Sequence, residues 1–534
     1  MLTCPGMCVR VNTVLSKDRI ALRSYTKSLV LSSNIHVEPC RARNSASTFS
    51  RARRPTVLIV VLGQMMVISP KSPIYPEWKD PTLPIYTKFY FLDLQNPQEV
   101  LEGGRPSVVE IGPYSYKMSL PRENVTFNDN GTVTSTQPYS YVFDRSQSVG
   151  DENDTFTTAN MPFWSTVYFV RDAGLLIKAA LSLFLASQKE EPFMRLSVRQ
   201  LIWGYDEPLF KWLHENLPDY PLPPGFETQF GFLLGRNDTP LGLYTVFTGV
   251  GNKMKVNQID KFNGMSHLTY WKSESANRIT GSDGMMYHRG IEEDEVLNLF
   301  HPDLCRSMPY TYVKDDSLKG VPLKIFGVAP WAYQNSTTYP PNQGFNITPD
   351  EVPRGLMRID PCRYGTPIAL SNPHFFDGDP SLAGGIDGLS QNPEKHRNYF
   401  SIEPILGMPF KLRMRLQINQ YMQQVQGISQ TGKVKTMYMP GFWFEEDVTA
   451  NDEVIGYYDT GIKLTGIIAL LMQYLSIAIG ASIIVAFLLV GFCKLITKEK
   501  KSIISEPIET NYDSTHVYDN INPVLTTQRN VQTP

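Results

Sequence analysis

The feature that most constrains this chain is an uncharged stretch near its C-terminus. From Leu464 to Cys493 there is no Asp, Glu, Lys or Arg, and most residues are aliphatic. A helix of ~20 apolar residues, rising about 1.5 Å per residue, crosses a hydrocarbon core roughly 30 Å thick. Helices buried in soluble proteins rarely stay uncharged for so long. We therefore predict a transmembrane helix over residues 463–493.

The charges on either side of this helix predict its orientation. Lysines follow it at positions 494, 498, 500 and 501, whereas the residues before it are rich in acid. Only the lysines count under the positive-inside rule, and they place residues 494–534 in the cytoplasm. Residues 71–462 then form one lumenal or extracellular ectodomain, since no Gly/Ser-rich or Pro-rich linker divides them.

A second, shorter apolar segment covers residues 56–70, after the arginines at 51, 53 and 54. It is short for a membrane span. One interpretation is a marginal signal anchor that holds residues 1–55 in the cytoplasm. A cleaved signal peptide is an alternative, although the segment begins unusually late in the chain for one. A third alternative is that it is neither. The protein is thus multi-pass or single-pass, with a cytoplasmic C-terminus.

Glycosylation sequons and cysteines agree with an exported ectodomain. Six Asn-x-Ser/Thr sequons precede the predicted span and none follows it; they begin at Asn124, Asn130, Asn153, Asn237, Asn335 and Asn346. Pro240 makes Asn237 the weakest acceptor. Cys305 and Cys362 are the two ectodomain cysteines, which an oxidising lumen would pair, with two buried free thiols as the alternative. Cys493, at the cytoplasmic edge of the span, is a palmitoylation candidate.

Strand signals dominate the ectodomain. Residues 412, 414, 416 and 418 are apolar and alternate with polar residues, which predicts a strand with one face on a core and one face in water. Further β-rich runs cover residues 86–92, 139–143 and 243–248. Helical signals lie at 174–187, 197–201 and 208–216. The first is apolar nearly all round, so it is either buried or exposes a binding face.

No catalytic motif supports an enzyme. There is no G-x-S-x-G, H-E-x-x-H, C-x-x-C or phosphate-binding glycine loop. The eight histidines are scattered; His374 and His396 are the most interesting, and we interpret them as structural. We predict no cofactor and no metal. The net charge of -2 argues against nucleic-acid binding.

Short motifs in a fixed order cover the whole ectodomain. They include Trp78-Lys79-Asp80-Pro81, Gly112-Pro113-Tyr114-Ser115-Tyr116, Asp144 to Gly150, Trp203-Gly204-Tyr205, Cys305-Arg306-Ser307, Pro373-His374-Phe375, His396-Arg397-Asn398-Tyr399 and Ile402-Glu403-Pro404. Each motif is weak alone, but their order is highly specific. In these motifs the chain resembles the class B scavenger receptor family, and the residues of the motifs are most similar to those of the lysosomal branch.

The resemblance implies an α+β fold. This is a large antiparallel β-barrel-like ectodomain with an apical helical bundle and an apolar tunnel, anchored by a transmembrane helix or helices. It implies ligand or partner binding at the apex, for which Leu181, Phe184 and Lys189 are candidates. Cys305 and Cys362 match one family disulfide, but residues 334–348 lack the cysteines of a second. Acid beside Lys189 weakens any anion-binding patch there.

The resemblance also implies function. We expect a membrane glycoprotein receptor that binds and transfers lipids (fatty acids, sterols or lipoproteins) and traffics through endosomes. The alternative is a lysosomal membrane protein that sorts a lysosomal enzyme as its cargo. Tyr518 and Ile521 fit a tyrosine-x-x-apolar motif that cytoplasmic sorting adaptors bind. Its location is then the plasma membrane, the lysosomal or endosomal membrane, or both.

Overall fold

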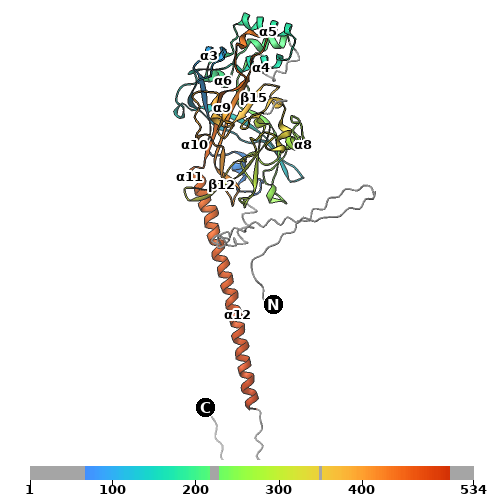
Figure 1. Cartoon of the computed structure of the whole chain (residues 1–534). Coiled ribbons are helices and arrows are strands. Elements are labelled where there is room, and N and C mark those ends of the chain that lie inside the picture. The colour runs from blue at the N-terminus through green and yellow to red at the C-terminus, as the bar shows by residue number, and fades with distance from the viewer. Residues whose placement is uncertain (1–65, 217–227, 348–351, 505–534) are drawn as a thin grey trace, which may run out of the picture. The chain divides into compact units, whose positions relative to one another are not determined.

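Figure 1 presents a computed structural model of the chain, which describes residues 66–216, 228–347 and 352–504. Eighteen strands and eleven α-helices are defined in this part, and most of the helices are short. The helices are α2 (Tyr75–Lys79), α3 (Pro97–Leu101), α4 (Met161–Val170), α5 (Leu175–Gln188), α6 (Val198–Trp203), α7 (Pro208–Asn216), α8 (Glu274–Asn277), α9 (Pro380–Gly384), α10 (Pro393–His396), α11 (Asp452–Tyr458) and α12 (Leu464–Ile504).

The strands carry most of the core. They are β1 (Ile85–Leu94), β2 (Val108–Ser119), β3 (Glu123–Phe127), β4 (Thr132–Phe143), β5 (Thr155–Ala159), β6 (Phe193–Ser197), β7 (Tyr205–Asp206), β8 (Gln229–Phe230), β9 (Thr239–Phe247), β10 (Ile259–Phe262), β11 (Val296–His301), β12 (Arg306–Leu318), β13 (Val321–Val328), β14 (Met357–Arg358), β15 (Ile368–Ser371), β16 (Tyr399–Glu403), β17 (Met408–Met422) and β18 (Met437–Thr449). The three strand runs expected from the sequence fall in β1, β4 and β9, and these predictions are confirmed.

Fourteen of the strands form one antiparallel sheet. Its main path runs β10-β9-β4-β2-β1-β18-β17-β16-β13-β12-β11, so β10 and β11 are its edges. The sheet does not close into a barrel, which corrects the barrel-like expectation. Residues Gly281 and Ser282 lie between the edges instead. The Ile259 N–H donates to the Gly281 carbonyl at 2.8 Å, and the Phe300 N–H donates to Ser282 at 2.8 Å.

The central strand β17 is buried on both of its faces. Its apolar row, Leu412 to Ile418, lies on the core side as the alternation predicts. The opposite row is not in water: Arg415 is 6% exposed and Gln417 and Asn419 are fully buried. Segment 369–398 covers this row and supplies hydrogen-bond partners such as Ser371 and Ala369. The prediction that this row faces solvent was therefore wrong, because an earlier part of the chain packs over it.

The helices predicted between residues 174 and 216 are confirmed. Ser197 and Gln200 form a capping box that begins α6, and α7 begins at Pro208, whose φ suits the first helical turn. We call α4, α5 and α7 the apical bundle, because they share one hydrophobic cluster with Met422 at the end of β17. Figure 1 shows α4 and α5 at the same end of the strand-rich body.

The predicted transmembrane stretch is helical throughout. Met408 and Phe410, at the start of β17, pack with Ile455 and Tyr458 of α11, so this helix lies at the opposite end of β17 from the apical bundle. The chain continues from α11 through a short π-helical turn into α12. Among the described residues, one helix is long and apolar enough to cross a membrane.

The start of the described chain also belongs to the folded body. Ile68 is 1% exposed, joins the main core cluster and donates a backbone hydrogen bond to Thr248. Met66 packs beside α11. The folded domain thus begins by residue 66, a few residues before the boundary expected at 71, and the rest of the segment 56–70 lies outside the described residues.

Candidate functional site

An apolar pocket opens between the first described helix and the central strands. Ile85, Val448 and Leu412 contribute to its lining from three adjacent strands, and Trp78 and Met286 complete it. Strand register explains this grouping, since Leu412 pairs with Val448 and Val448 pairs with Ile85 across three adjacent strands. Glu77 is the one charged residue in the lining. The pocket therefore suits an apolar ligand.

The inner row of β18 continues from this pocket and carries one acid. Phe442, Phe444, Glu446 and Val448 alternate on the same side of the strand, and Glu446 pairs with Met414 of β17. No Lys, Arg or His of the described residues lies within 4 Å of the Glu446 carboxylate. Burial, and then the charge of Asp303, raises its pKa to about 7. Near neutral pH, Glu446 can thus hold a proton inside an apolar row.

The apical bundle divides helix α5 into a buried row and an exposed face. Leu181 and Leu185 are fully buried, and Phe184 stacks on Trp212 with ring centroids 4.5 Å apart. The largest exposed side chains are apolar: Leu175 is 69% exposed, and the values for Leu176 and Leu183 are 87% and 74%. Helix α5 is thus buried on one side and exposes an apolar face on the other, so each of the two alternatives is correct in part.

The candidate apex residues have different positions. Leu181 anchors the helix in the cluster, so it is not available to a ligand. Phe184 is half-buried, and Lys189 is exposed in a left-handed conformation just after the helix ends. The exposed leucines are the residues that the sequence analysis missed. Their exposure depends on which row faces α4 and α7, and a helix apolar all round carries no such signal.

Two acids lie beneath the apical bundle. Glu207 is 2% exposed, and its Oε1 accepts a hydrogen bond from the Leu209 N–H at the start of α7. Glu190 follows α5 and accepts a hydrogen bond from Asn160, the N-cap of α4. Burial, and then the charge of Glu190, raises the pKa of Glu207 to about 8, and burial also raises the pKa of Glu190.

We expect the stability of the apical bundle to increase as the pH falls. The pKa of Glu207 rises from 4.5 to about 8 on folding, so the folded state binds the extra proton between these values. The stabilisation from protonated Glu207 is complete below pH 4.5. It is lost as the pH rises from 4.5 to about 8, by up to about 1.4 kcal/mol per pH unit. Glu207→Gln should flatten this dependence in thermal unfolding followed by tryptophan fluorescence. The control Glu215→Gln alters an exposed acid of α7; equal slopes in all three proteins would contradict the expectation.

The two histidines singled out above are buried, and they meet the exposed residue Glu110 in one cluster. The rings of His374 and His396 stack with centroids 4.4 Å apart. His374 Nε2 lies 2.5 Å from Glu110 Oε2, which also accepts a hydrogen bond from Trp443 Nε1 at 2.8 Å. Burial, and then the charge of His374, lowers the pKa of His396 to about 4.

The chemistry of the ring nitrogens decides what this cluster can hold. One ligand atom from each of the three residues falls within 4.8 Å of the others, so a metal ion would fit geometrically. However, both Nδ1 atoms accept backbone hydrogen bonds, from Ser390 at 3.0 Å and Asn392 at 3.1 Å. The neutral rings therefore carry their protons on Nε2, where a metal would need a lone pair. This arrangement favours a structural hydrogen-bond cluster, which is how the sequence analysis interpreted the histidines.

The predicted covalent sites have these positions. Cys305 and Cys362 form a disulfide with Cα atoms 6.3 Å apart. Asn124, Asn130, Asn153 and Asn237 are exposed, while Asn335 and Asn346 are half-buried. Cys493 is free and exposed on α12, and its palmitoylation stays a prediction. The sorting candidates Tyr518 and Ile521 lie outside the described residues.

A broken alternation could have revealed Glu446, since it interrupts an apolar row in the sequence of β18. Glu207 had no comparable signal. Its burial results from the packing of α5 against α7, between residues distant in the chain.

A strand-rich body with an apolar pocket, an apolar helical face and a C-terminal helix long and apolar enough to cross a membrane fits a membrane receptor better than an enzyme. Residues 55–491 match the model of the CD36 family, and the chain belongs to this family.

Curated relatives agree with this assignment. Scavenger receptor class B member 1 of Mus musculus is 33% identical over 433 residues, covering 81% of this chain and 83% of the relative. Lysosome membrane protein 2 is 32% identical in Homo sapiens, covering 78% and 86%, and 31% identical in Mus musculus, covering 78% and 85%. These identities do not single out the lysosomal branch that the sequence motifs favoured.

Proposed function

We propose that this protein is a membrane receptor that binds and transfers lipid through the interior of its ectodomain and travels through the endosomal system. The observation that carries the proposal is the apolar pocket around Leu412, which continues into the inner row of β17 and β18. Burying an acyl chain gains ~0.8 kcal/mol per methylene, so a channel along this row would bind single-chain lipids usefully.

A charged cluster around Asp303 is the second group of residues that we assign to the lipid path. Asp303 is held by Arg236 Nη1 at 2.8 Å and by Arg363 Nη2 at 2.6 Å. The Asp303 side chain keeps 37% of its surface accessible. Burial acts to raise the pKa of Asp303, but the charges of Arg236 and Arg363 hold it below its usual range. We infer that this cluster and Glu446 line the tunnel.

A second function, delivery of a lysosomal enzyme as cargo, rests on the apical bundle. Exposed leucines at 175, 176 and 183 form an apolar face of α5 of the kind that marks protein-protein contacts. One relative carries the name lysosome membrane protein, which makes a lysosomal role reasonable to test. The two functions use opposite ends of β17 and can be separated by mutation.

The test of lipid transport is native purification followed by lipid analysis. Full-length protein in a mild detergent should carry fatty acid or sterol in near-stoichiometric amount. A fluorescent fatty acid should bind and be displaced by the natural lipid. If no lipid co-purifies and neither fatty acid nor cholesterol binds, the transport proposal fails and cargo binding becomes the better account.

The cargo alternative has its own test at the apical face. We expect Leu183→Asp to weaken binding of a protein ligand at least tenfold, because a charge would be desolvated in the contact. Surface plasmon resonance against candidate lysosomal enzymes would measure this. Val142→Asp, at another exposed position with 67% exposure, is the matched control. If both variants bind as the wild type does, the exposed leucines are not a docking face.

A further inference from the structure

One buried arginine stands apart from the others. Arg306 begins β12 directly after Cys305 and is 6% exposed. In the described part of the chain it has no carboxylate within 4 Å, and its buried Nε has no hydrogen-bond partner. Buried arginines are normally paired. Here Arg358 pairs with Asp360, and Arg415 pairs with Glu445 at 2.8 Å.

Aromatic rings satisfy only part of the Arg306 guanidinium. Its central carbon lies 3.7 Å from the centroid of the Phe345 ring and 5.1 Å from that of Trp271. Such cation-π contacts stabilise a guanidinium through its faces, whereas its N–H groups point outward in the plane. Burial lowers the pKa of Arg306 to about 10, which leaves it positively charged at neutral pH. Its donors therefore remain available to an acceptor.

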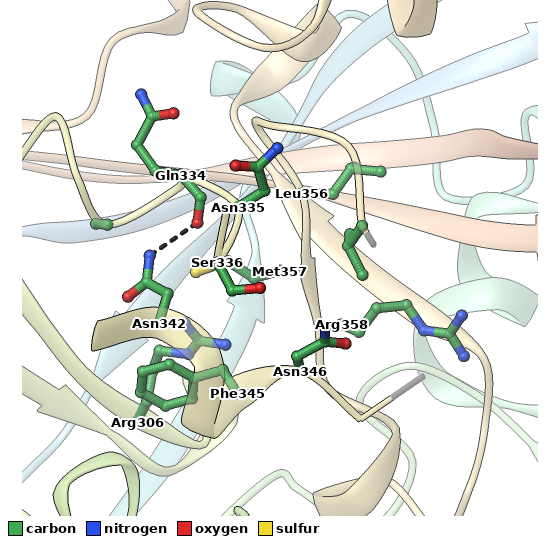
Figure 2. A pocket seen from close by; sticks show the side chains of 12 residues that line it. Arg306, Gln334, Asn335, Ser336, Asn342, Phe345, Asn346, Leu356, Met357 and Arg358 are labelled. Carbon is green, nitrogen blue, oxygen red and sulfur yellow. Dashed lines mark hydrogen bonds between the residues drawn. The ribbon is translucent and has the colours of Figure 1, made fainter. Parts of the chain in front are cut away.

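Arg306 lines a pocket of mixed character, in which polar side chains lie beside apolar ones such as Leu356 and Met357. Figure 2 shows Arg306 and Phe345 on one side, with Asn342, Ser336 and Asn346 around the remaining space. The Nδ2 of Asn342 is already used, because it donates to the carbonyls of Trp331 at 2.9 Å and Gln334 at 2.8 Å. Asn346 Oδ1 is a buried acceptor without a partner. The pocket thus holds one unmatched cationic donor and one unmatched acceptor.

The second arginine of the pocket does not change this balance. Arg358 contributes to the lining, but its Nε donates to Asp360 Oδ1 at 2.7 Å and its Nη2 donates to the hydroxyl of Tyr168 at 3.1 Å. Its charge is thus neutralised within the protein. Arg306 supplies the one uncompensated charge among the described lining residues, so the pocket favours an anion.

We propose that the pocket beside Arg306 binds an oxyanion that also carries a hydroxyl group, such as a hydrogen phosphate or a phosphate monoester. Two oxygens of the anion accept hydrogen bonds from the Arg306 guanidinium, which binds phosphate in a bidentate manner. The hydroxyl donates to Asn346 Oδ1. Asn335 and Asn346, both sequon asparagines, border this pocket, so a glycan on either would lie at its mouth.

The direct probe is inorganic phosphate, followed by ³¹P NMR on the full-length protein in detergent. The ³¹P resonance of phosphate should broaden on binding. Sulfate, which has no hydroxyl at neutral pH, should displace the bound phosphate at least several-fold more weakly than a phosphate monoester does. A short-chain phosphatidic acid identifies the source: tighter binding than free phosphate assigns the site to a lipid headgroup, and equal binding assigns it to soluble phosphate. Equal competition by sulfate would overturn the role of the hydroxyl.

Two variants test the assignment to Arg306. Arg306→Gln should weaken phosphate binding at least tenfold. Because that change is buried, Gln334→Glu gives a second test: it is isosteric and places a carboxylate in the pocket lining, where it should exclude phosphate without loss of thermal stability. Gln343→Glu adds the same charge at an exposed position of the same loop and should bind as the wild type does.

The glycans are removed by Thr337→Ala with Thr348→Ala, which keeps both asparagines and leaves the pocket uncovered. Phosphate binding by this double variant supports the site. Absence of binding in both the wild type and the double variant would show that the pocket holds water only. Undiminished binding by the Gln334→Glu variant would place the phosphate elsewhere. Either result overturns the proposal.

Discussion

Replacing Cys362 with serine should lower the free energy of unfolding of the ectodomain by about 4 kcal/mol. The disulfide to Cys305 closes a loop with a sequence separation of 57 residues, which lowers the conformational entropy of the unfolded chain. Loss of the disulfide restores this entropy and so stabilises the unfolded state. Cys305 is 1% exposed and its carbonyl accepts a hydrogen bond from Trp271 Nε1 at 2.7 Å, so the bond lies within the core.

The measurement is denaturant unfolding of the two proteins under non-reducing conditions. Cys493→Ser is the matched control, since this thiol is free and should leave stability unchanged. A non-reduced digest of the wild type should contain the linked peptides. A change below about 1 kcal/mol, or alkylation of both Cys305 and Cys362 in the mature wild type, would contradict the expectation.

The second large effect concerns transport. Leu412→Trp should reduce lipid transfer at least tenfold, because Leu412 lines the apolar pocket and the larger ring would fill it. Leu412 is half-buried, so the indole has room toward the pocket, and β17 should keep its pairing with β18. Uptake of a fluorescent fatty acid into cells or proteoliposomes measures the effect.

Val142→Trp provides the control, since it adds the same ring at a position with 67% exposure. Binding of a protein ligand to α5 should survive both changes. Normal lipid transfer by a correctly folded Leu412→Trp protein would exclude this pocket from the path. Delivery of a protein cargo would then be the remaining function that we propose for this protein.

Local sequence patterns predicted the elements of this fold well. The uncharged stretch at 464–493 forms part of α12, the capping pair Ser197 and Gln200 begins α6, and the alternation at 412–418 lies in β17. These features depend on neighbouring residues in the chain, whose periodicity and caps act within a few turns or one strand. The cysteine pair, although distant in the chain, could be predicted for a different reason: no other ectodomain cysteines competed for it.

What the tertiary structure alone decided involves residues far apart in the chain. Segment 369–398 buries the polar row of β17, Gly281 and Ser282 lie between the edge strands β10 and β11, and α4 and α7 select which side of α5 is exposed. Glu207 and Arg306 become unusual only after burial removes their water, because a charge in solution carries no sign of its later surroundings. The sequence by itself thus determined the elements, the membrane helix and the family. Long-range packing determined which polar groups lack partners, and these groups define the candidate sites.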